Sequence, residues 1–531
     1  FNTEQELQKK GSYQINEGES QTMNYDFSLN FSRQVKELHY LFGFLSYSLD
    51  ETTYEENIYK AEGFPSDRMN SIFFARQYAE DTKPQGAEST TRNIGVNAVF
   101  NYSYDDRLLF DATFRTNASS QFGANQRWGN FWSLGAGWNM HNEKWLRSKE
   151  WFSRLKLRAS VGSTGSQGNN AYQSLATYNY SEKNYENKLG AYLMGMENKD
   201  LKWQKKMDYN VGMDMSVKNN FNLVFDYYQS TTENLLVAFT LPPSTGFTTV
   251  QENVGKVRNT GIELSMSYMV LSHPQDRTFL TLSLRAAHNK NRVVKISDSM
   301  KAYNEKMDEM AESDSKLVTK YYDGVSMNAI WAVRSLGIDP ATGREIYLTK
   351  DGVSTYEYRA EDMVVCGDNL PKLRGSFGIN LGYKGFGLNV MCMYELGAKM
   401  YNETLVDRVE NVNMSYAVDK RVLEGRWQKP GDKVRFRSLK QVWDPEKQAY
   451  KVDEKTYATS RFVQKKNELN ISSINFSYDF FRHAFVKKMG MERLSVAFYM
   501  NDVAKLSTIK TERGLSYPFA RNYNFSLQMT F

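Results

Sequence analysis

Histidine and cysteine often hold metals or catalyse reactions, and in this 531-residue chain they are few and scattered. No two histidines have metal-ligand spacing, no HExxH or GxSxG motif is present, and the two cysteines form no CxxC pair. We therefore expect neither enzyme activity nor a cofactor. The residues concerned are His39, His141, His273, His288, His483, Cys366 and Cys392.

Two other segments have compositions that can bind ligands. Residues 162–168, GSTGSQG, are glycine-rich, but they lack the lysine of a phosphate-binding loop and no helix pattern follows. The acidic residues at 105–106 and within 351–361 do not match the ligand spacing of an EF-hand calcium loop. We expect the glycine-rich segment to be a flexible loop between strands.

Aromatic side chains in the segments without periodicity are better candidates for binding. Tyr and Trp rings can stack on sugar faces or peptide side chains while a polar atom stays exposed. For any one of them, packing within a loop or against a partner protein is the simpler role. The set comprises Tyr178, Tyr180, Tyr185, Tyr192, Trp203, Phe247, Tyr321, Tyr322, Trp331 and Tyr401.

The elements that must position these residues are predicted by alternation of apolar and polar side chains. In residues 209–217, YNVGMDMSV, every second side chain is apolar. Runs of roughly 9–12 residues suit a tilted strand that crosses a bilayer. We expect fifteen strands, at 22–32, 38–49, 91–104, 107–116, 131–140, 154–162, 204–217, 221–231, 259–270, 278–290, 373–383, 386–396, 467–480, 493–502 and 521–531.

Connection lengths distinguish a membrane barrel from a soluble sugar-binding sandwich, because alternation alone fits both. Short connections such as 105–106, 218–220, 271–277 and 384–385 alternate with long ones. Outer-membrane barrels have this asymmetry, with short periplasmic turns and long extracellular loops. We therefore predict an all-β fold, a transmembrane antiparallel β-barrel. The long connections expected are 50–90, 163–203, 232–258, 291–372 and 397–466.

In such a barrel the polar strand face lines the lumen, where charged side chains can shape a passage. A solvated wall in contact with a plug is the simpler role for them. The charged positions predicted to face the lumen are Asp111, Arg115, Lys156, Arg158, Asp214, Asp226 and Glu263.

Composition excludes several other classes of protein. The mean hydropathy is −0.61, and no run approaches the ~18–20 apolar residues of a transmembrane helix. The net charge of +6 is spread along the chain without a basic block, so nucleic acid is not an expected partner. The chain starts at Phe1 without a recognisable signal peptide, and single-chain barrels usually have an even number of strands. We expect further strands to precede this chain.

Eight stretches carry motifs in a consistent order: NYSYDDRLLFDATFRTNASSQFGANQRWGNFWSLGAGWNM (101–140), LKLRASVGSTGSQGNNAY (155–172), NKDLKWQKKMDYNVGMDM (198–215), DYYQSTTENLL (226–236), LPPSTGFTTVQENVGKVRNTGIELSMSY (241–268), GIDPATG (337–343), RWQKPGD (426–432) and SYPFARNYNFSLQMTF (516–531). Together they resemble the C-terminal barrel portion of the SusC/RagA family of TonB-dependent outer-membrane transporters. Departures at Asn117-Ala118, 467–480 and 501–503 indicate a divergent member.

This resemblance implies that residues 1–531 are the C-terminal part of a barrel of about 22 strands. A signal peptide, a plug domain with a TonB box and about seven strands would lie outside this chain. The resemblance also implies residence in the outer membrane of a Gram-negative bacterium, in contact with lipid and lipopolysaccharide. Its partners would be TonB and a SusD-like surface lipoprotein that acts as a lid, and such pairs would form dimers.

The function implied by the resemblance is active import of a bulky nutrient, driven by the proton-motive force through TonB. An oligosaccharide is the expected substrate, and an oligopeptide is the alternative. A passive pore or an adhesive barrel without TonB coupling is a further alternative, which an upstream plug domain would argue against.

The last nine residues, YNFSLQMTF, alternate up to the terminal aromatic side chain. We expect this to be the closing strand of the barrel, paired with the first strand of the missing part. By resemblance to outer-membrane proteins generally, its apolar face is the signal read by the barrel-assembly machinery. That face comprises Tyr523, Phe525, Leu527, Met529 and Phe531.

Overall fold

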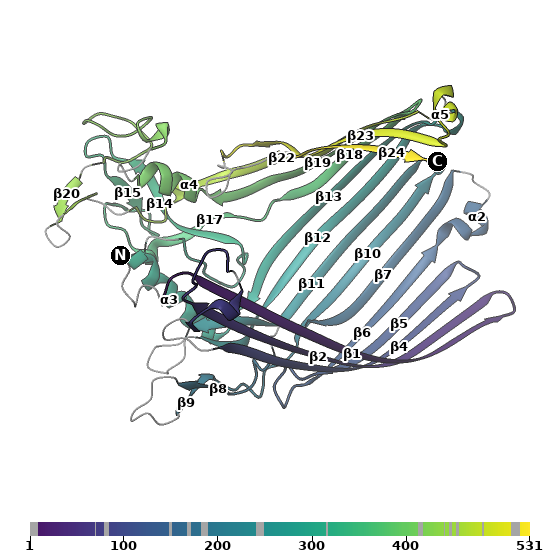
Figure 1. Ribbon diagram of the computed structural model, residues 1–531. Helices are drawn as coiled ribbons and strands as arrows, with labels where there is room; N and C mark the ends of the chain where they lie inside the picture. Colours follow the sequence, from purple (N-terminus) through teal and green to yellow (C-terminus); the bar gives the residue numbers. More distant parts are fainter. Residues whose placement is uncertain are drawn as a thin grey trace.

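An open, curved antiparallel sheet dominates the molecule (Figure 1). Across the described residues sixteen strands join in this sheet; fifteen follow chain order, and β3 (Gln77–Tyr78) pairs with β2. No helix in this part of the chain is long and apolar enough to cross a membrane. The computed structural model describes residues 9–69, 71–78, 84–147, 151–166, 171–181, 190–240, 249–314, 317–412, 418–439, 441–444, 449–452, 456–480, 483–510 and 521–531.

All fifteen predicted strands are present, so the all-β, antiparallel prediction is confirmed. The bounds of β10 and β18 agree with the prediction, whereas most other strands are longer. The strands are β1 (Ser12–Val35), β2 (His39–Glu62), β4 (Gln85–Tyr104), β5 (Leu108–Ser119), β6 (Trp128–Asn139), β7 (Phe152–Ser166), β10 (Gln204–Val217), β11 (Phe221–Thr240), β12 (Thr249–His273), β13 (Thr278–Lys295), β18 (Leu373–Tyr383), β19 (Phe386–Tyr401), β22 (Val463–Asp479), β23 (Arg493–Ser507) and β24 (Tyr523–Thr530).

Several hairpins extend further on the extracellular side than predicted. β1 and β2 stay paired up to Ser12 and Glu62, and β11 and β12 up to Thr240 and Thr249. The predicted connections 50–90 and 232–258 are therefore wrong over much of their length. Beyond the bilayer both faces of a hairpin meet water, so the apolar alternation fades while backbone pairing continues.

Short turns join the strands at the opposite end of the sheet, as predicted. Lys36 and Glu37, Asp105 and Asp106, and Lys218 and Asn219 have φ between 48° and 57°. Two successive left-handed residues form a turn whose twist matches that of a β-hairpin. Two longer turns at this end carry short helices, α2 (Lys144–Arg147) and α5 (Ala484–Lys488).

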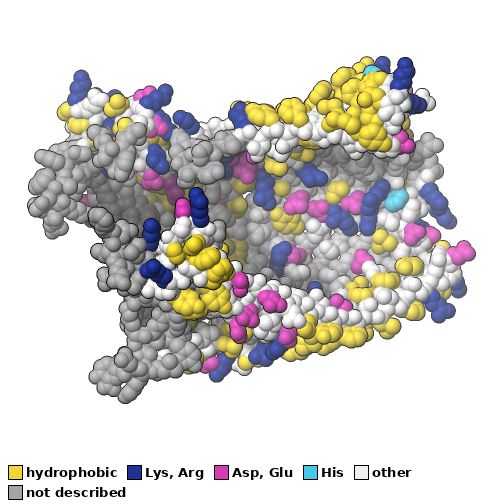
Figure 2. Space-filling model, viewed as in Figure 1, with side chains coloured by type: hydrophobic (Ala, Val, Ile, Leu, Met, Phe, Trp, Pro, Cys, Tyr) yellow, Lys and Arg dark blue, Asp and Glu magenta, His cyan; other side chains and the backbone are white. Residues whose placement is uncertain are grey.

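The two faces of the sheet differ in chemistry. Phe27, Leu29 and Phe31 on β1 are more than half exposed, and large apolar side chains continue along the outer face of the other strands. Figure 2 looks into the hollow of the sheet, where Lys, Arg, Asp and Glu side chains gather on the inner wall. Edge strands β1 and β24 do not pair with each other, so the described strands do not close into a barrel.

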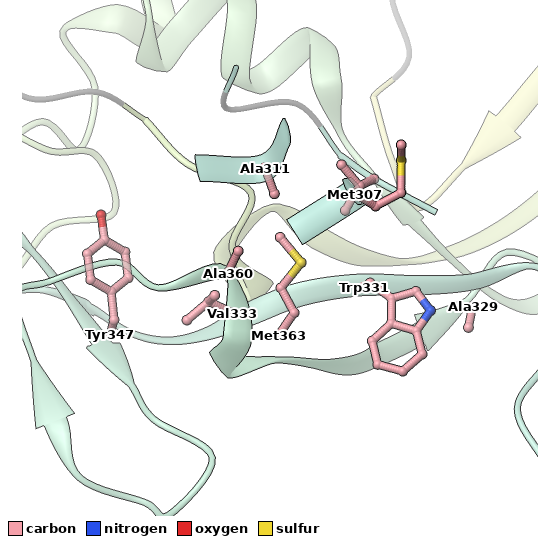
Figure 3. Close-up of a cluster of buried hydrophobic side chains, with 9 residues drawn as sticks. Met307, Ala311, Ala329, Trp331, Val333, Tyr347, Ala360 and Met363 are labelled. Atoms are coloured by element: carbon pink, nitrogen blue, oxygen red, sulfur yellow. The ribbon is translucent and has the colours of Figure 1, made fainter. Parts of the chain in front are cut away.

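A folded domain lies at the extracellular end, between β13 and β22. Its small sheet has the strand order β16-β15-β14-β17. Figure 3 shows Met307 and Ala311 of α3 beside Trp331 and Val333 of β14 and Met363 of β17, in a core of their own. The elements are α3 (Asp298–Asp314), β14 (Ala329–Ile338), β15 (Glu345–Leu348), β16 (Ser354–Thr355), β17 (Met363–Asp368) and α4 (Glu403–Leu405).

Shorter elements complete the described part of the chain. Two strand pairs, β8–β9 and β20–β21, form small separate sheets. The remaining elements are β8 (Thr177–Ser181), β9 (Gly190–Gly195), β20 (Gln441–Asp444), β21 (Ala449–Val452), a π-helical turn η7 (Val406–Glu410), and the 3-10 turns η1 (Ile72–Phe74), η2 (Met140–Asn142), η5 (Pro274–Asp276), η6 (Ala360–Asp362), η8 (Lys420–Val422) and η9 (Ser460–Phe462).

Candidate functional site on the inner wall

A row of charged side chains crosses the inner wall from β7 to β22. Strand pairing aligns one position on each of eight neighbouring strands, and charged residues occupy six of these positions. Because side chains alternate between faces, aligned residues share one face of the sheet. This charge row comprises Arg158, Gly212, Asp226, Glu263, Ala287, Arg374, Glu395 and Glu468.

The β7 end of the charge row is held by ion pairs. Arg158 lies with Nη2 2.7 Å from Asp226 Oδ2 and Nε 3.1 Å from Asp214 Oδ1. Gly212 stands between Arg158 and Asp226 in the row, and a Cβ there would lie 2.6 Å from the guanidinium carbon and 2.7 Å from Asp226 Oδ1. The glycine therefore lets the arginine of β7 reach the carboxylate of β11 across β10.

The β22 end is paired as well. Lys466 Nζ lies 3.2 Å from Glu395 Oε2 and 3.3 Å from Glu468 Oε2, and Lys505 Nζ lies 2.8 Å from Glu468 Oε1. Two lysines thus offset the two neighbouring glutamates of β19 and β22.

The middle of the charge row is different. Glu263 and Arg374 of the row, and Arg285 beside it on β13, form no side-chain hydrogen bond or ion pair within the described residues. All three line a groove of about 540 Å³ on the inner wall. Asp226 and Glu395 border the same groove, so its walls carry both signs of charge.

The structure groups some of the predicted lumen residues and separates others. Arg158, Asp214, Asp226 and Glu263 lie in or beside the charge row, and Lys156 is aligned with Asp214. Asp111 instead accepts a hydrogen bond from Asn101, on the pair β4–β5. Arg115 lines a second, polar pocket of about 410 Å³ with Asp50, Asn93, Asn117 and Trp203.

Three groove residues were missed from the sequence: Arg285, Arg374 and Glu395. Each alternates with apolar side chains on its strand, as Asp226 and Glu263 do, so the same signal could have identified them.

Three of the aromatic candidates pack inside the protein. Trp203, Trp331 and Tyr401 are less than a tenth exposed. Trp203 stacks on Phe122 at a centroid distance of 4.3 Å, and its Nε1 donates to the Arg127 carbonyl at 2.9 Å. The packing role is therefore confirmed for these three.

The other aromatic candidates are exposed or half-buried, or they lie outside the described residues. Tyr178, Tyr192 and Tyr322 are exposed, and Tyr321 is half-buried. Burial raises the pKa of the Tyr321 hydroxyl above its usual value. Tyr185, Phe247 and the side chain of Tyr180 lie outside the described part of the chain.

The glycine-rich segment is mostly not a loop. Gly162 to Ser166 belong to β7, which corrects the prediction, and only the end of the segment lies outside the described residues. A Cβ at Gly165 would lie 2.0 Å from the ring of Phe131, and one at Gly162 would lie 2.8 Å from Ser133 Cβ. These glycines therefore make room for side chains of β6.

Four of the sequence motifs are joined in two pairs by hydrogen bonds. Gly123 and Asn125 donate to the carbonyls of Leu201 and Lys199, which joins the first motif to the third.

The extracellular motifs meet in the same way. Trp427 Nε1 and Gly431 N both donate to the Pro340 carbonyl, at 2.9 and 2.8 Å. In the turn of the first of these motifs, hydrogen bonds from the Thr342 hydroxyl, the Ala341 N–H and the Tyr356 hydroxyl lower the pKa of Asp339 below its usual value. These hydrogen bonds therefore give the two motifs a structural role.

Buried charges fasten the loops of the extracellular domain. Arg461 Nη2 lies 2.7 Å from Glu345 Oε2 and 2.7 Å from Glu410 Oε1, and Thr459 Oγ1 donates to Glu345 Oε1 at 2.8 Å. Burial alone would lower the pKa of Arg461, but the two glutamates outweigh it and raise this pKa. The pair network joins β15, η7 and η9, which lie far apart in the chain.

A curved antiparallel sheet with an apolar outer face, a charged inner face, tight turns at one end and folded loops at the other defines the wall of an outer-membrane β-barrel. The model of a family described as "TonB dependent receptor-like, beta-barrel" matches residues 2–412. The chain therefore belongs to this family and resides in the outer membrane.

Similar proteins specify the type of receptor. "TonB-dependent receptor P39" of Formosa agariphila is 24% identical, over 92% of this chain and 50% of that protein. "TonB-dependent receptor SusC" of Bacteroides thetaiotaomicron is 28% identical, over 53% of this chain and 29% of that protein. The chain spans about half the length, or less, of such curated relatives.

A solved structure shares the fold. The "RagAB peptide importer in the 'closed-closed' state" superposes with a TM-score of 0.81 at 19% identity, over 98% of this chain and 56% of that chain. Together with the family model and the SusC relative, this shared fold confirms the resemblance to the SusC/RagA type.

Proposed function

We propose that this chain forms part of the wall of a TonB-dependent importer that moves a bulky nutrient across the outer membrane. The observation that carries the proposal is the unpaired middle of the charge row. Glu263, Arg285 and Arg374 face the lumen without partners in the described residues and border a groove. Charges that only stabilised the wall would be paired, as they are at both ends of the row.

The rest of the transporter is part of this proposal. A plug domain, the TonB contact and about seven further strands would be supplied outside these residues, to give the expected barrel of about 22 strands. Strand edges exposed to lipid are unfavourable because lipid offers no hydrogen bonds, which supports additional strands next to β1 and β24. A SusD-like lipoprotein would cover the extracellular end, and such pairs would associate as dimers in lipid and lipopolysaccharide.

The groove favours an oligopeptide over the oligosaccharide expected from the sequence. A peptide carries both an ammonium and a carboxylate. The groove offers an opposite charge for each, Glu263 on β12 and Arg374 on β18, with strand β13 between them. A neutral glycan has no comparable use for two opposite charges. The similar RagAB protein is described as a peptide importer, which agrees with this choice.

Uptake by a deletion strain tests the proposal. We expect the strain to lose growth on an oligopeptide panel, to keep growth on glycans, and to recover with the wild-type gene. Arg285→Ala should impair recovery. Arg292→Ala is the matched control, because Arg292 is an exposed arginine on the opposite face of the same strand. Loss of growth on glycans alone would show that the substrate is an oligosaccharide. Uptake that persists without TonB would show that the protein is a passive pore.

A further inference from the structure

Two periplasmic turns carry basic side chains that have no partner. Lys487 and Lys488 lie in α5, and Lys144 and Arg147 lie in α2. All four are exposed, and none of their side chains forms a hydrogen bond or an ion pair within the described residues.

Large apolar side chains are exposed beside these cations. Phe485 and Met489 accompany the lysines of α5, and Met489 is 64% exposed. Trp145 and Trp151 accompany α2, and Trp151 is 67% exposed. Each helix buries a different apolar residue, Val486 in α5 and Leu146 in α2. The buried residue fixes the helix against the rim, so the exposed apolar groups are not merely frayed ends.

The apolar groups of α5 continue the lipid-facing surface of the barrel. Phe386 and Tyr478 face outward on β19 and β22, with ring centroids 4.4 Å apart. Tyr478 contacts Phe480 at 4.6 Å, and Phe480 contacts Phe485 at 5.6 Å. The Tyr478 hydroxyl lies 2.7 Å from His483 Nε2, which ties the start of α5 to this aromatic chain.

The turn that holds α2 is attached in a comparable way. Trp138, on the outer face of β6, donates from Nε1 to Glu143 Oε1 at 3.0 Å, directly before α2. The Lys218 ammonium lies 5.6 Å from the ring centre of Trp151, so a fifth basic group joins this surface. Figure 1 places α2 and α5 at the same end of the sheet.

Acidic groups at this rim are largely neutralised. Asp479 binds Arg277 and Arg493, each at 2.9 Å, and Glu143 binds Arg107 at 3.2 Å. Glu492, which follows α5, counts one negative charge against the two lysines of this helix. Both helices therefore keep a net positive, unpaired charge next to exposed apolar side chains.

We propose that α2 and α5 are interfacial anchors that bind the headgroups of anionic phospholipids in the periplasmic leaflet. The ammonium and guanidinium groups would contact phosphate oxygens, while the aromatic and methionine side chains enter the boundary between headgroups and acyl chains. A soluble partner is a poorer fit, because Phe485 continues the face that already contacts lipid.

Lipid retention by the intact transporter tests this anchor. The protein is extracted from the outer membrane in mild detergent, mixed with phosphatidylglycerol or phosphatidylcholine, and examined by native mass spectrometry. We expect selective retention of phosphatidylglycerol. The quadruple variant Lys144→Gln, Arg147→Gln, Lys487→Gln, Lys488→Gln should weaken that retention by about tenfold or more. The double variant Lys429→Gln, Lys433→Gln removes exposed extracellular lysines and should change nothing.

A measurement on the wild-type protein protects the test against a variant that fails to fold. Raising the salt concentration to 1 M should remove the preference, because exposed charges are then screened within a few ångströms. Equal retention of both lipids by the wild-type protein would overturn the proposal. So would unchanged selectivity in a quadruple variant that still shows the heat-dependent gel shift of a folded barrel.

Discussion

At the scale of single residues, the buried glutamate Glu410 should control the extracellular domain. It is fully buried and lies within 2.7 Å of Arg461 and 3.6 Å of Arg437. Glu410→Gln keeps the shape of the side chain but leaves two buried arginines short of a counter-charge. Removing one partner of a buried ion pair typically costs about 3–5 kcal/mol. We expect much faster hydrogen exchange in residues 402–412, measured by mass spectrometry.

The matched control for this prediction is Glu357→Gln. Glu357 also pairs with an arginine, Arg359, but its side chain is 75% exposed. Exposed pairs contribute little, so exchange should be unaffected. Protection of residues 402–412 that is equal in the Glu410 variant and the wild-type protein would show that the buried pair does not hold the domain together.

Single residues also mark the limit of what the sequence could predict about the site. Alternation placed Arg158, Asp214 and Asp226 on the inner face correctly, since side-chain period is a local property. Their ion pairs were not predictable, because Arg158 and Asp226 meet only through the register of three strands and the space left by Gly212. The burial of Trp331 likewise depends on α3 and β17, which only the tertiary fold brings against it.

At the scale of elements, Gly343 should fix the contact between two extracellular turns. Its φ is +73°, and a Cβ would lie 2.5 Å from the ring of Trp427. Gly343→Ala should therefore combine backbone strain of about 1–2 kcal/mol with a collision that separates the turns. We expect new sites of limited proteolysis in residues 426–432.

Gly352→Ala separates the two effects. Gly352 has φ of +85°, but a Cβ there would meet nothing within 4 Å. This variant should show the strain alone and keep residues 426–432 resistant to protease. If both variants were cleaved alike, backbone strain rather than the contact with Trp427 would explain the effect.

Strand bounds were predictable from the sequence within the membrane, and they were not predictable where strands extend beyond it. β18 has the predicted ends because lipid and lumen impose opposite polarities along its whole length. β2 runs on to Glu62 through TTYEEN, where both faces are solvated and no alternation remains. Its pairing there is with β1 and β4, which only the fold supplies.

At the scale of the whole molecule, the open sheet leaves two edges. The backbone groups on the outer sides of β1 and β24 have no strand beside them among the described residues. Lipid cannot satisfy such groups, and an exposed edge is a template for another strand. A heat-dependent gel shift from these 531 residues alone would contradict the proposal that further strands complete the barrel.

The edge strand β24 also carries the proposed assembly signal. Tyr523, Phe525, Leu527, Met529 and Phe531 lie on one face of an exposed edge, so both backbone and side chains are available for recognition by strand addition. Phe531→Ser should reduce assembled transporter in the outer membrane to a small fraction, measured by the heat-dependent gel shift. Phe73→Ser is the matched control, because Phe73 is 76% exposed and Phe531 is 79% exposed, yet Phe73 lies in an extracellular turn. Equal assembly of the two variants would show that β24 is recognised through its backbone edge alone.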